Sequence, residues 1–390
     1  GKWHLGDEVF AQHGFDEWVS VEDLYQPHYR PGRAAQARSS YHHWLVEAGF
    51  APDLPQGMFS RERSCCLPEP WGKPAFLEQN ASRFIRAHRD RPFALYVNFL
   101  EPHMPFFGPR TALYDPAHLP LPAGYTHVPG PGDPLHVRVK AQQFAERFEW
   151  YDLTTERGWQ QLAAGYYGLC TLVDHYVGRI LNTLSECGLD EHTIVVFTSD
   201  HGEHLGAHRL VGKGTMYQDS IRVPLLLRLP GQRRGYTLSG PLSQVDLVPT
   251  LLELMGASVP EHLHGKSRAA ALGAHADIHL TDDVVVQWNP APPHQPPREP
   301  RPDQVAMAGS AERARAVLDQ HLRTLITADG WRLTLSQAGE HELIDLRHDQ
   351  METRNRFADP IEAPRRRAMQ QRLHARLRAA GDPVDLPIPD

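Results

Sequence analysis

The chain has 390 residues and a formal net charge of −7, with 41% hydrophobic and 22% charged residues. This balance is typical of a globular protein with a large core, and it excludes a generally basic nucleic-acid-binding surface while allowing a local basic pocket. Four cysteines are too few for a disulfide framework in a chain of this size. No apolar run reaches the roughly 18 residues of a membrane span. Oligomeric state stays open, as does the compartment, cytoplasm or periplasm of a bacterium.

The first third of the chain is rich in proline and aromatic residues. Gly1 to Gly6 carries Lys2 and His4, and we expect it to be a strand end or loop. Prolines interrupt residues 16–75, whose tyrosines and histidines are equally compatible with a substrate-pocket loop and with surface packing. A helix is predicted at about Ala75 to Arg89.

The apolar run Phe93 to Phe99 predicts a buried strand. Glu101-Pro102-His103 leaves its end, which makes His103 a candidate for substrate contact. Residues 104–135 are rich in proline and glycine, and a loop of this length is typical of a lid or a binding loop. The spacing of apolar residues from Ala163 to Leu184 then predicts an amphipathic helix.

Ile194 to Phe197 is the strand around which we expect the fold to be organised, because a buried parallel strand delivers polar groups at its carboxyl end. Asp200 and His201 follow it and suggest a metal or anion site. Lys213 lies between two glycines that permit a close backbone approach. Whether the intervening polar residues contact a ligand is left open; these are Glu203, His204 and His208.

Three parts are predicted: residues 1–286 as a catalytic domain, 287–304 as a proline-rich linker or loop, and 305–390 as an α+β subdomain. In the first part a further strand and a further helix are expected at Arg222 to Leu229 and Val245 to Met255. The third part has short alternating runs, typical of an antiparallel meander, followed by a helix. These elements are Leu322 to Thr327, Trp331 to Leu335, Glu342 to Leu346 and about Pro364 to Ala379.

Several motifs occur in a familiar order: Gly1-Lys2-Trp3-His4-Leu5-Gly6, Asn98 to Phe106, Ser199-Asp200-His201-Gly202-Glu203 with Lys213, and Glu342-Leu343-Ile344-Asp345-Leu346. With them the chain resembles the sulfatase family of the alkaline-phosphatase-like superfamily over nearly its whole length. The resemblance implies an α/β sandwich with a large, mostly parallel central sheet flanked by helices. It also implies a small C-terminal subdomain of antiparallel sheet and helix.

The resemblance also implies roles for individual residues. Asp200 and His201 would be metal ligands, with Ca²⁺ expected first and Mg²⁺ or Mn²⁺ after it, because a hard cation prefers oxygen ligands. Lys2, Lys213 and His103 would gather the sulfate oxygens. His4 would orient the nucleophile, and His103 with Lys213 would protonate the leaving oxygen.

The family's nucleophile is a formylglycine made from the cysteine of Cys-x-Pro-x-Arg. Cys66-Leu67-Pro68-Glu69-Pro70 has proline at the arginine position, and it follows the Gly-Lys-Trp-His element that the nucleophile should precede. We interpret it as an ordinary loop. Formylglycine and the remaining metal ligands are therefore expected in an N-terminal portion that this chain lacks, and the chain alone is expected to be inactive.

The predicted activity is hydrolysis of a small-molecule or carbohydrate sulfate monoester at the S–O bond. Two alternatives stay open. A phosphonate or phosphate ester hydrolase of the same superfamily would use nearly the same residues, because sulfate and phosphate are both tetrahedral oxyanions. A non-catalytic binder of sulfated ligands would keep the cationic residues without a nucleophile.

Overall fold

The computed structural model describes residues 3–23, 29–34, 36–290, 299–384 and 386. The chain divides into two compact units. The first unit comprises Gly1–Leu121, Phe148–Val195 and Leu227–Gln232, and the second comprises Pro122–Arg147, Val196–Leu226 and Arg233–Asp390.

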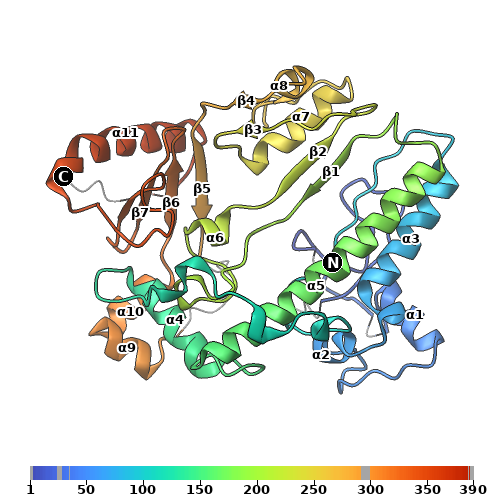
Figure 1. Ribbon diagram of the computed structural model, residues 1–390, viewed down its shortest axis with the longest axis horizontal. Coiled ribbons are helices and arrows are strands. Elements are labelled where there is room, and N and C mark those ends of the chain that lie inside the picture. Colours follow the sequence, from blue (N-terminus) through green and yellow to red (C-terminus); the bar gives the residue numbers. More distant parts are fainter. Residues whose placement is uncertain (1–2, 24–28, 35, 291–298, 385, 387–390) are drawn as a thin grey trace. The chain divides into compact units, whose positions relative to one another are not determined.

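Two long helices dominate the first unit, where α3 (Lys73–His88) and α5 (Glu156–Glu186) lie side by side (Figure 1). The helix α3 agrees with its prediction. The helix α5 begins earlier than predicted because the hydroxyl of Thr155 caps it, accepting a hydrogen bond from Gly158 N at 3.1 Å. The shorter helices of this unit are α1 (Ser40–Glu47), α2 (Arg61–Cys65), η2 (Glu69–Trp71), η3 (Thr111–Leu113) and η4 (Pro116–His118).

The strand predicted at Phe93 to Phe99 does not form among the described residues. A strand requires a neighbour that completes its hydrogen-bond ladder, and no described strand pairs with this segment. Val97 and Phe99 nevertheless pack as partly buried residues against an apolar cluster. The buried members of that cluster are Val21, Tyr41, Leu45, Phe59, Leu67, Phe76 and Leu77.

The predicted large central sheet also differs from the described structure, whose sheets are small. The strands β1 (Val195–Thr198) and β2 (Leu225–Arg228) form a two-stranded sheet. Phe197 is 39% exposed and Leu226 67% exposed, so β1 is not the fully buried strand that was predicted. The helices that cover both faces of a wide parallel sheet therefore do not bury these two side chains. A second pair is parallel and consists of β3 (Leu238–Ser239) and β4 (Ile278–His279).

The C-terminal part of the second unit contains a four-stranded antiparallel sheet, which includes the predicted meander. The helix α11 (Ala363–Ala379) packs on it (Figure 1) with Met369, Leu373 and Leu377, which recur at every fourth residue. The first strand includes Gln287 and Trp288, which were predicted to begin the linker. The strands are β5 (Val284–Trp288), β6 (Leu322–Ile326), β7 (Trp331–Ser336) and β8 (Glu342–Asp345).

The remaining helices of the second unit are mostly short. The helix α4 packs against α9 and α10 through a cluster that includes Leu135, Val139 and Val317. No helix in the described part of the chain is long and apolar enough to cross a membrane. The bounds are α4 (Leu135–Arg147), α6 (Gln218–Ile221), α7 (Leu247–Leu254), α8 (Ala269–Gly273), α9 (Pro302–Ala308), α10 (Ala311–Leu318), η5 (Ala123–Thr126), η6 (Ala207–Arg209), η7 (Gln244–Asp246) and η8 (Pro360–Glu362).

Candidate functional site

Asp200 and His201 follow the end of β1 and lie side by side. His201 Nε2 is 3.4 Å from Asp200 Oδ2, and the Asp200 side chain is 74% exposed. His201 Nδ1 is 2.8 Å from the Gly202 carbonyl oxygen. Because a carbonyl oxygen only accepts, this contact assigns a proton to Nδ1.

This arrangement fits part of a divalent-cation site. A metal-ligating histidine usually donates its other ring N–H to a carbonyl or carboxylate, as His201 does to Gly202. Two protein donors are nevertheless fewer than the about six to eight oxygen ligands that Ca²⁺ takes. Among the described residues no group of three or more His, Cys, Asp or Glu side chains is arranged to hold a metal ion. Metal binding by Asp200 and His201 therefore stays a prediction.

The residue after His201 is a glycine because the backbone of α6 lies against it. Gly202 N donates to Ser220 O at 2.8 Å. A Cβ atom at this position would lie 2.0 Å from Asp219 O and 3.1 Å from Arg222 O. Those atoms are backbone, so they cannot rotate away.

Substituting Gly202→Ala is therefore expected to lower the free energy of unfolding by about 1–3 kcal/mol, as overpacking of a filled site does. Urea unfolding measures the change. Gly178→Ala is the matched control, because no atom lies within 4 Å of its added Cβ in α5, and it should stabilise the chain by about 0.5–1 kcal/mol. Equal stability of the two variants would contradict this account of Gly202.

Lys213 lies near the end of residues 203–214, which we term the Lys213 loop. The Glu203 carboxylate closes this loop by accepting hydrogen bonds from Leu205 N, at 3.1 Å, and from Gly212 N. Burial raises the pKa of Glu203 above its usual range. Glu203 therefore stabilises the loop that carries the candidate lysine, by bonds to its backbone.

The Lys213 loop contains three non-glycine residues with left-handed backbone: Leu205 at φ 47°, His208 at φ 55° and Arg209 at φ 57°. Such residues are uncommon and need support from their surroundings. Arg209 provides some of it, since its Nε donates to Tyr125 O at 2.8 Å and its guanidinium lies 3.6 Å from the centre of the Tyr125 ring.

Two histidines of this loop are buried. The His208 side chain is 1% exposed, and its ring stacks on Tyr217 with centroids 4.0 Å apart. His208 Nδ1 lies 2.8 Å from His127 Nδ1. His204 Nε2 lies 2.9 Å from the hydroxyl of Thr215. Burial lowers the pKa of His204 to about 3 and that of His208 to about 4. The structure thus gives both histidines packing roles within the loop.

The burial of His208 has a consequence for acid stability. Between about pH 6.5 and pH 4 the unfolded chain protonates this histidine and the folded chain does not, so the free energy of unfolding falls as pH falls. His127 acts in the same direction as burial, and Asp133 opposes it. His208→Asn, which tolerates left-handed backbone, should reduce this pH slope by up to about 1.4 kcal/mol per pH unit.

Urea unfolding at a series of pH values measures that slope. His118→Asn is the control, because the His118 side chain is 84% exposed. An unchanged slope in the His208 variant would show that His208 takes up a proton in the folded chain as readily as in the unfolded one.

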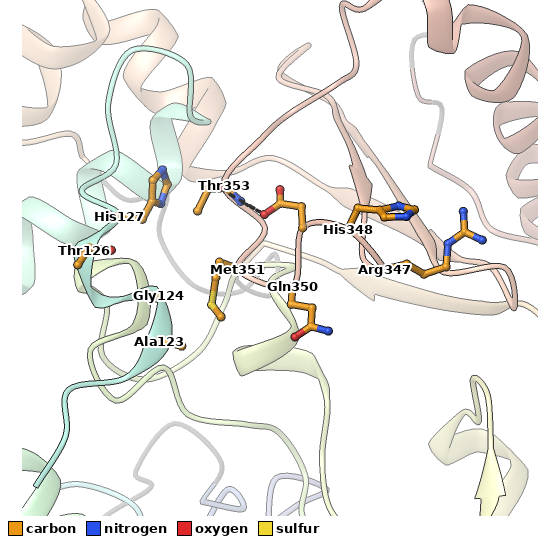
Figure 2. A pocket seen from close by; sticks show the side chains of 10 residues that line it. Ala123, Gly124, Thr126, His127, Arg347, His348, Gln350, Met351 and Thr353 are labelled. Atoms are coloured by element: carbon orange, nitrogen blue, oxygen red, sulfur yellow. Dashed lines mark hydrogen bonds between the residues drawn. The ribbon is translucent and has the colours of Figure 1, made fainter.

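A cavity of about 550 Å³ lies in the second unit, between η5 and the segment after β8. Figure 2 shows Gln350 and Met351 between His127 and His348. His127 connects the cavity to the Lys213 loop through its contact with His208. No candidate residue lines the cavity, whose lining is Ala123, Gly124, Thr126, His127, Arg347, His348, Asp349, Gln350, Met351 and Thr353.

The remaining candidates belong to the first unit. His103 Nδ1 lies 2.7 Å from Met104 O, so Nδ1 carries a proton. His4 is exposed. Lys2 lies outside the described residues. The roles predicted for these three residues stay predictions.

Cys66 is exposed and follows the end of α2, where its backbone N–H donates to Glu62 O and Arg63 O. Burial raises the pKa of the neighbouring Cys65 thiol to about 12, which disfavours its thiolate. Glu69, four residues before the start of α3, pairs with Arg110 at 2.7 Å. These contacts are those of a structural connection into α3.

The short helix α6 links the two candidate segments of the second unit. Ser220 accepts from Gly202 N with its carbonyl oxygen and from Gly214 N with its hydroxyl, at 2.8 and 3.1 Å. The start of α6 is itself bound, since Gln218 N donates to Glu352 Oε2 at 2.6 Å. Sequence reasoning missed Ser220, because it belongs to no motif and to no periodic pattern. Glu352 follows the motif Glu342 to Leu346, but nothing in the sequence indicated that it binds α6.

The sequence model of the sulfatase family matches residues 1–257. The chain belongs to the sulfatase family. Every candidate residue named above lies within the matched range, whereas Glu352 lies beyond it.

This sulfatase-family chain has similar relatives among curated proteins and solved structures. It is 31% identical to the multifunctional alkaline phosphatase superfamily protein PehA of Trinickia caryophylli, over 58% of the chain and 48% of the relative. It is 29% identical to the ulvan-active sulfatase of Formosa agariphila, over 68% of the chain and 45% of the relative. The matches thus span about half the length of these relatives.

Among solved structures, the phosphonate monoester hydrolase SpPMH of Silicibacter pomeroyi is similar, with a TM-score of 0.68 and 25% identity. The similarity covers 87% of this chain and 68% of that one. An alkaline-phosphatase-like α/β fold is therefore supported for this sulfatase-family chain, although its described sheets are small.

Proposed function

We propose that the protein to which this chain belongs hydrolyses sulfate monoesters at the S–O bond with the help of a divalent cation. The observation that carries the proposal is the bonding of α6 to both candidate segments, since Ser220 binds the glycine after His201 and the glycine after Lys213. A cation held by the carboxylate–imidazole pair and a lysine on a fixed loop would neutralise a sulfate group, and groups held in place need little reorganisation during the reaction.

In this proposal Asp200 and His201 hold the cation, with Ca²⁺ favoured over Mg²⁺ and Mn²⁺. The exposed carboxylate of Asp200 offers oxygen, which hard cations prefer. When bound, the cation neutralises negative charge on the reacting groups. Lys213, His103 and Lys2 bind the sulfate oxygens.

Hydrolysis of the ester also needs a nucleophile and an acid. His4 orients the nucleophile, and His103 with Lys213 protonates the leaving oxygen. A formylglycine is expected as the nucleophile, as the resemblance implies, and no Cys-x-Pro-x-Arg occurs in the 390 residues. This chain by itself is therefore proposed to bind sulfate and to leave the ester intact.

The substrate class is proposed to be a small-molecule or carbohydrate sulfate ester. The name of the Formosa relative, an ulvan-active sulfatase, favours a carbohydrate. Hydrolysis of phosphonate or phosphate esters is the second candidate, because the chain is similar to a phosphonate monoester hydrolase. Binding of sulfated ligands without catalysis is the remaining alternative.

The test combines a binding and a turnover measurement on the chain with Ca²⁺ present. Calorimetry should detect binding of inorganic sulfate, and para-nitrophenyl sulfate should not be turned over. Turnover that Lys213→Ala abolishes would contradict the inactivity of the chain and confirm the hydrolase. Faster turnover of para-nitrophenyl phosphate, or binding of phosphate in preference to sulfate, would favour the second candidate.

A further inference from the structure

The ammonium of Lys140, on α4, contacts the backbone of the Lys213 loop at the candidate lysine. Lys140 Nζ donates to Lys213 O and to Gly214 O, each at 2.8 Å. Hydrogen bonds from a charged donor are roughly twice as strong as neutral ones. Because the two acceptors are consecutive carbonyls, these hydrogen bonds restrict the peptide group between Lys213 and Gly214 and the peptide group that follows it.

The opposite side of the same backbone is bound as well. Gly214 N donates to the hydroxyl of Ser220 at 3.1 Å. Gly214 has φ +91°, and a Cβ atom there would lie 2.3 Å from Lys140 Nζ. Glycine therefore allows both the backbone conformation and the close approach of the ammonium.

Trp288, at the end of β5, covers the Lys140 ammonium. Lys140 Nζ lies 5.6 Å from the centre of the indole ring, within the range of a cation–π interaction. The edge of the same ring would lie 3.1 Å from a Cβ on Gly214. The indole thus packs beside both the ammonium and the backbone that the ammonium binds.

We propose that Lys140 is a positioning residue for Lys213: it fixes the backbone from which the Lys213 side chain extends toward the sulfate oxygens. The inference rests on the proposed function, in which Lys213 binds sulfate. Lys140 acts through its bonds to the loop and does not touch the substrate. Fixing the loop in advance reduces the ordering that sulfate binding would otherwise require.

A double-mutant cycle on the full chain tests this role, with calorimetric titration of inorganic sulfate as the measurement. Lys140→Met removes both hydrogen bonds and should weaken sulfate binding about tenfold, as the loss of one charge-assisted bond does. In the Lys213→Ala background the same substitution should change affinity less than about twofold, because its effect passes through Lys213. A merely structural role would produce equal losses in both backgrounds.

Two variants serve as matched controls. Lys140→Arg keeps charged donors and should stay within about threefold of the wild-type affinity. Lys266→Met removes a lysine whose side chain is 62% exposed and pairs with Asp282, and it should leave the affinity unchanged. Hydrogen exchange provides a readout independent of sulfate: the amides of Gly212 and Gly214 should exchange faster in Lys140→Met than in Lys266→Met.

Gly214→Ala should also displace the Lys140 ammonium, because the added Cβ would lie only 2.3 Å from Nζ. It should weaken sulfate binding and likewise have little further effect in the Lys213→Ala background. Additive losses, or unchanged exchange at Gly212 and Gly214, would overturn the positioning role while leaving the proposed function intact. Wild-type chain that binds no sulfate, or binding that Lys213→Ala leaves unchanged, would overturn the proposed function, and the inference with it.

Discussion

Replacing Arg332 with methionine is expected to lower the free energy of unfolding by about 3–5 kcal/mol. The Arg332 side chain is 0% exposed and lies between two buried carboxylates, with Glu342 at 3.3 Å and Glu352 at 2.8 Å. Burial raises the pKa of Glu352 to about 7 even with the arginine present. Removing the guanidinium leaves both carboxylates buried without their cation, which is the most costly way to break an ion pair.

Chemical denaturation monitored by circular dichroism measures this loss. Arg315→Met is the control, because Arg315 and its partner Glu299 are 45% and 80% exposed in their side chains, and it should change stability by less than about 0.5 kcal/mol. Adding Glu352→Gln to Arg332→Met should recover part of the loss by removing one unpaired charge. A loss below about 1 kcal/mol in Arg332→Met would contradict the buried ion-pair account.

Lys213→Ala is expected to raise the dissociation constant of inorganic sulfate about 10- to 100-fold, because a hydrogen bond to a charged group contributes about 1.5–3 kcal/mol. Titration calorimetry at constant ionic strength measures it, since salt screens exposed charges. Lys266→Ala is the matched control in the same unit, and its affinity should equal that of the wild type. Equal losses in the two variants would indicate general charge attraction in place of a specific lysine contact.

Local patterns in the sequence predicted the long helices well. The helix α3 was predicted at about Ala75 to Arg89 and is observed at Lys73–His88. The glycines on either side of Lys213 indicated a close backbone approach, and Gly214 has one. The helix was predictable because helix periodicity depends on neighbouring residues alone. The glycines were informative because only glycine leaves room for such an approach, although the sequence did not show that Lys140 makes it.

The support of the candidate site was not predictable in the same way. Lys140 binds a carbonyl 73 residues further along the chain, and Gln218 binds a carboxylate 134 residues further along. A lysine on a helix and a glutamate in a turn are ordinary surface residues until the fold brings their partners near. The buried central strand was predicted from apolar composition, but burial also depends on neighbouring strands, and β1 has one described neighbour.

The hydrogen bond that Gln218 N donates to Glu352 has a consequence for the evolution of such proteins. The matched family region ends at residue 257, yet the helix that binds Gly202 and Gly214 begins at an amide bonded to Glu352. A C-terminal part exchanged with that of a relative must bring an acceptor for this amide. If that acceptor is a buried carboxylate, the exchanged part must also bring a cation that pairs with it, as Arg332 pairs with Glu352. The C-terminal sheet and the Lys213 loop are therefore expected to be inherited together.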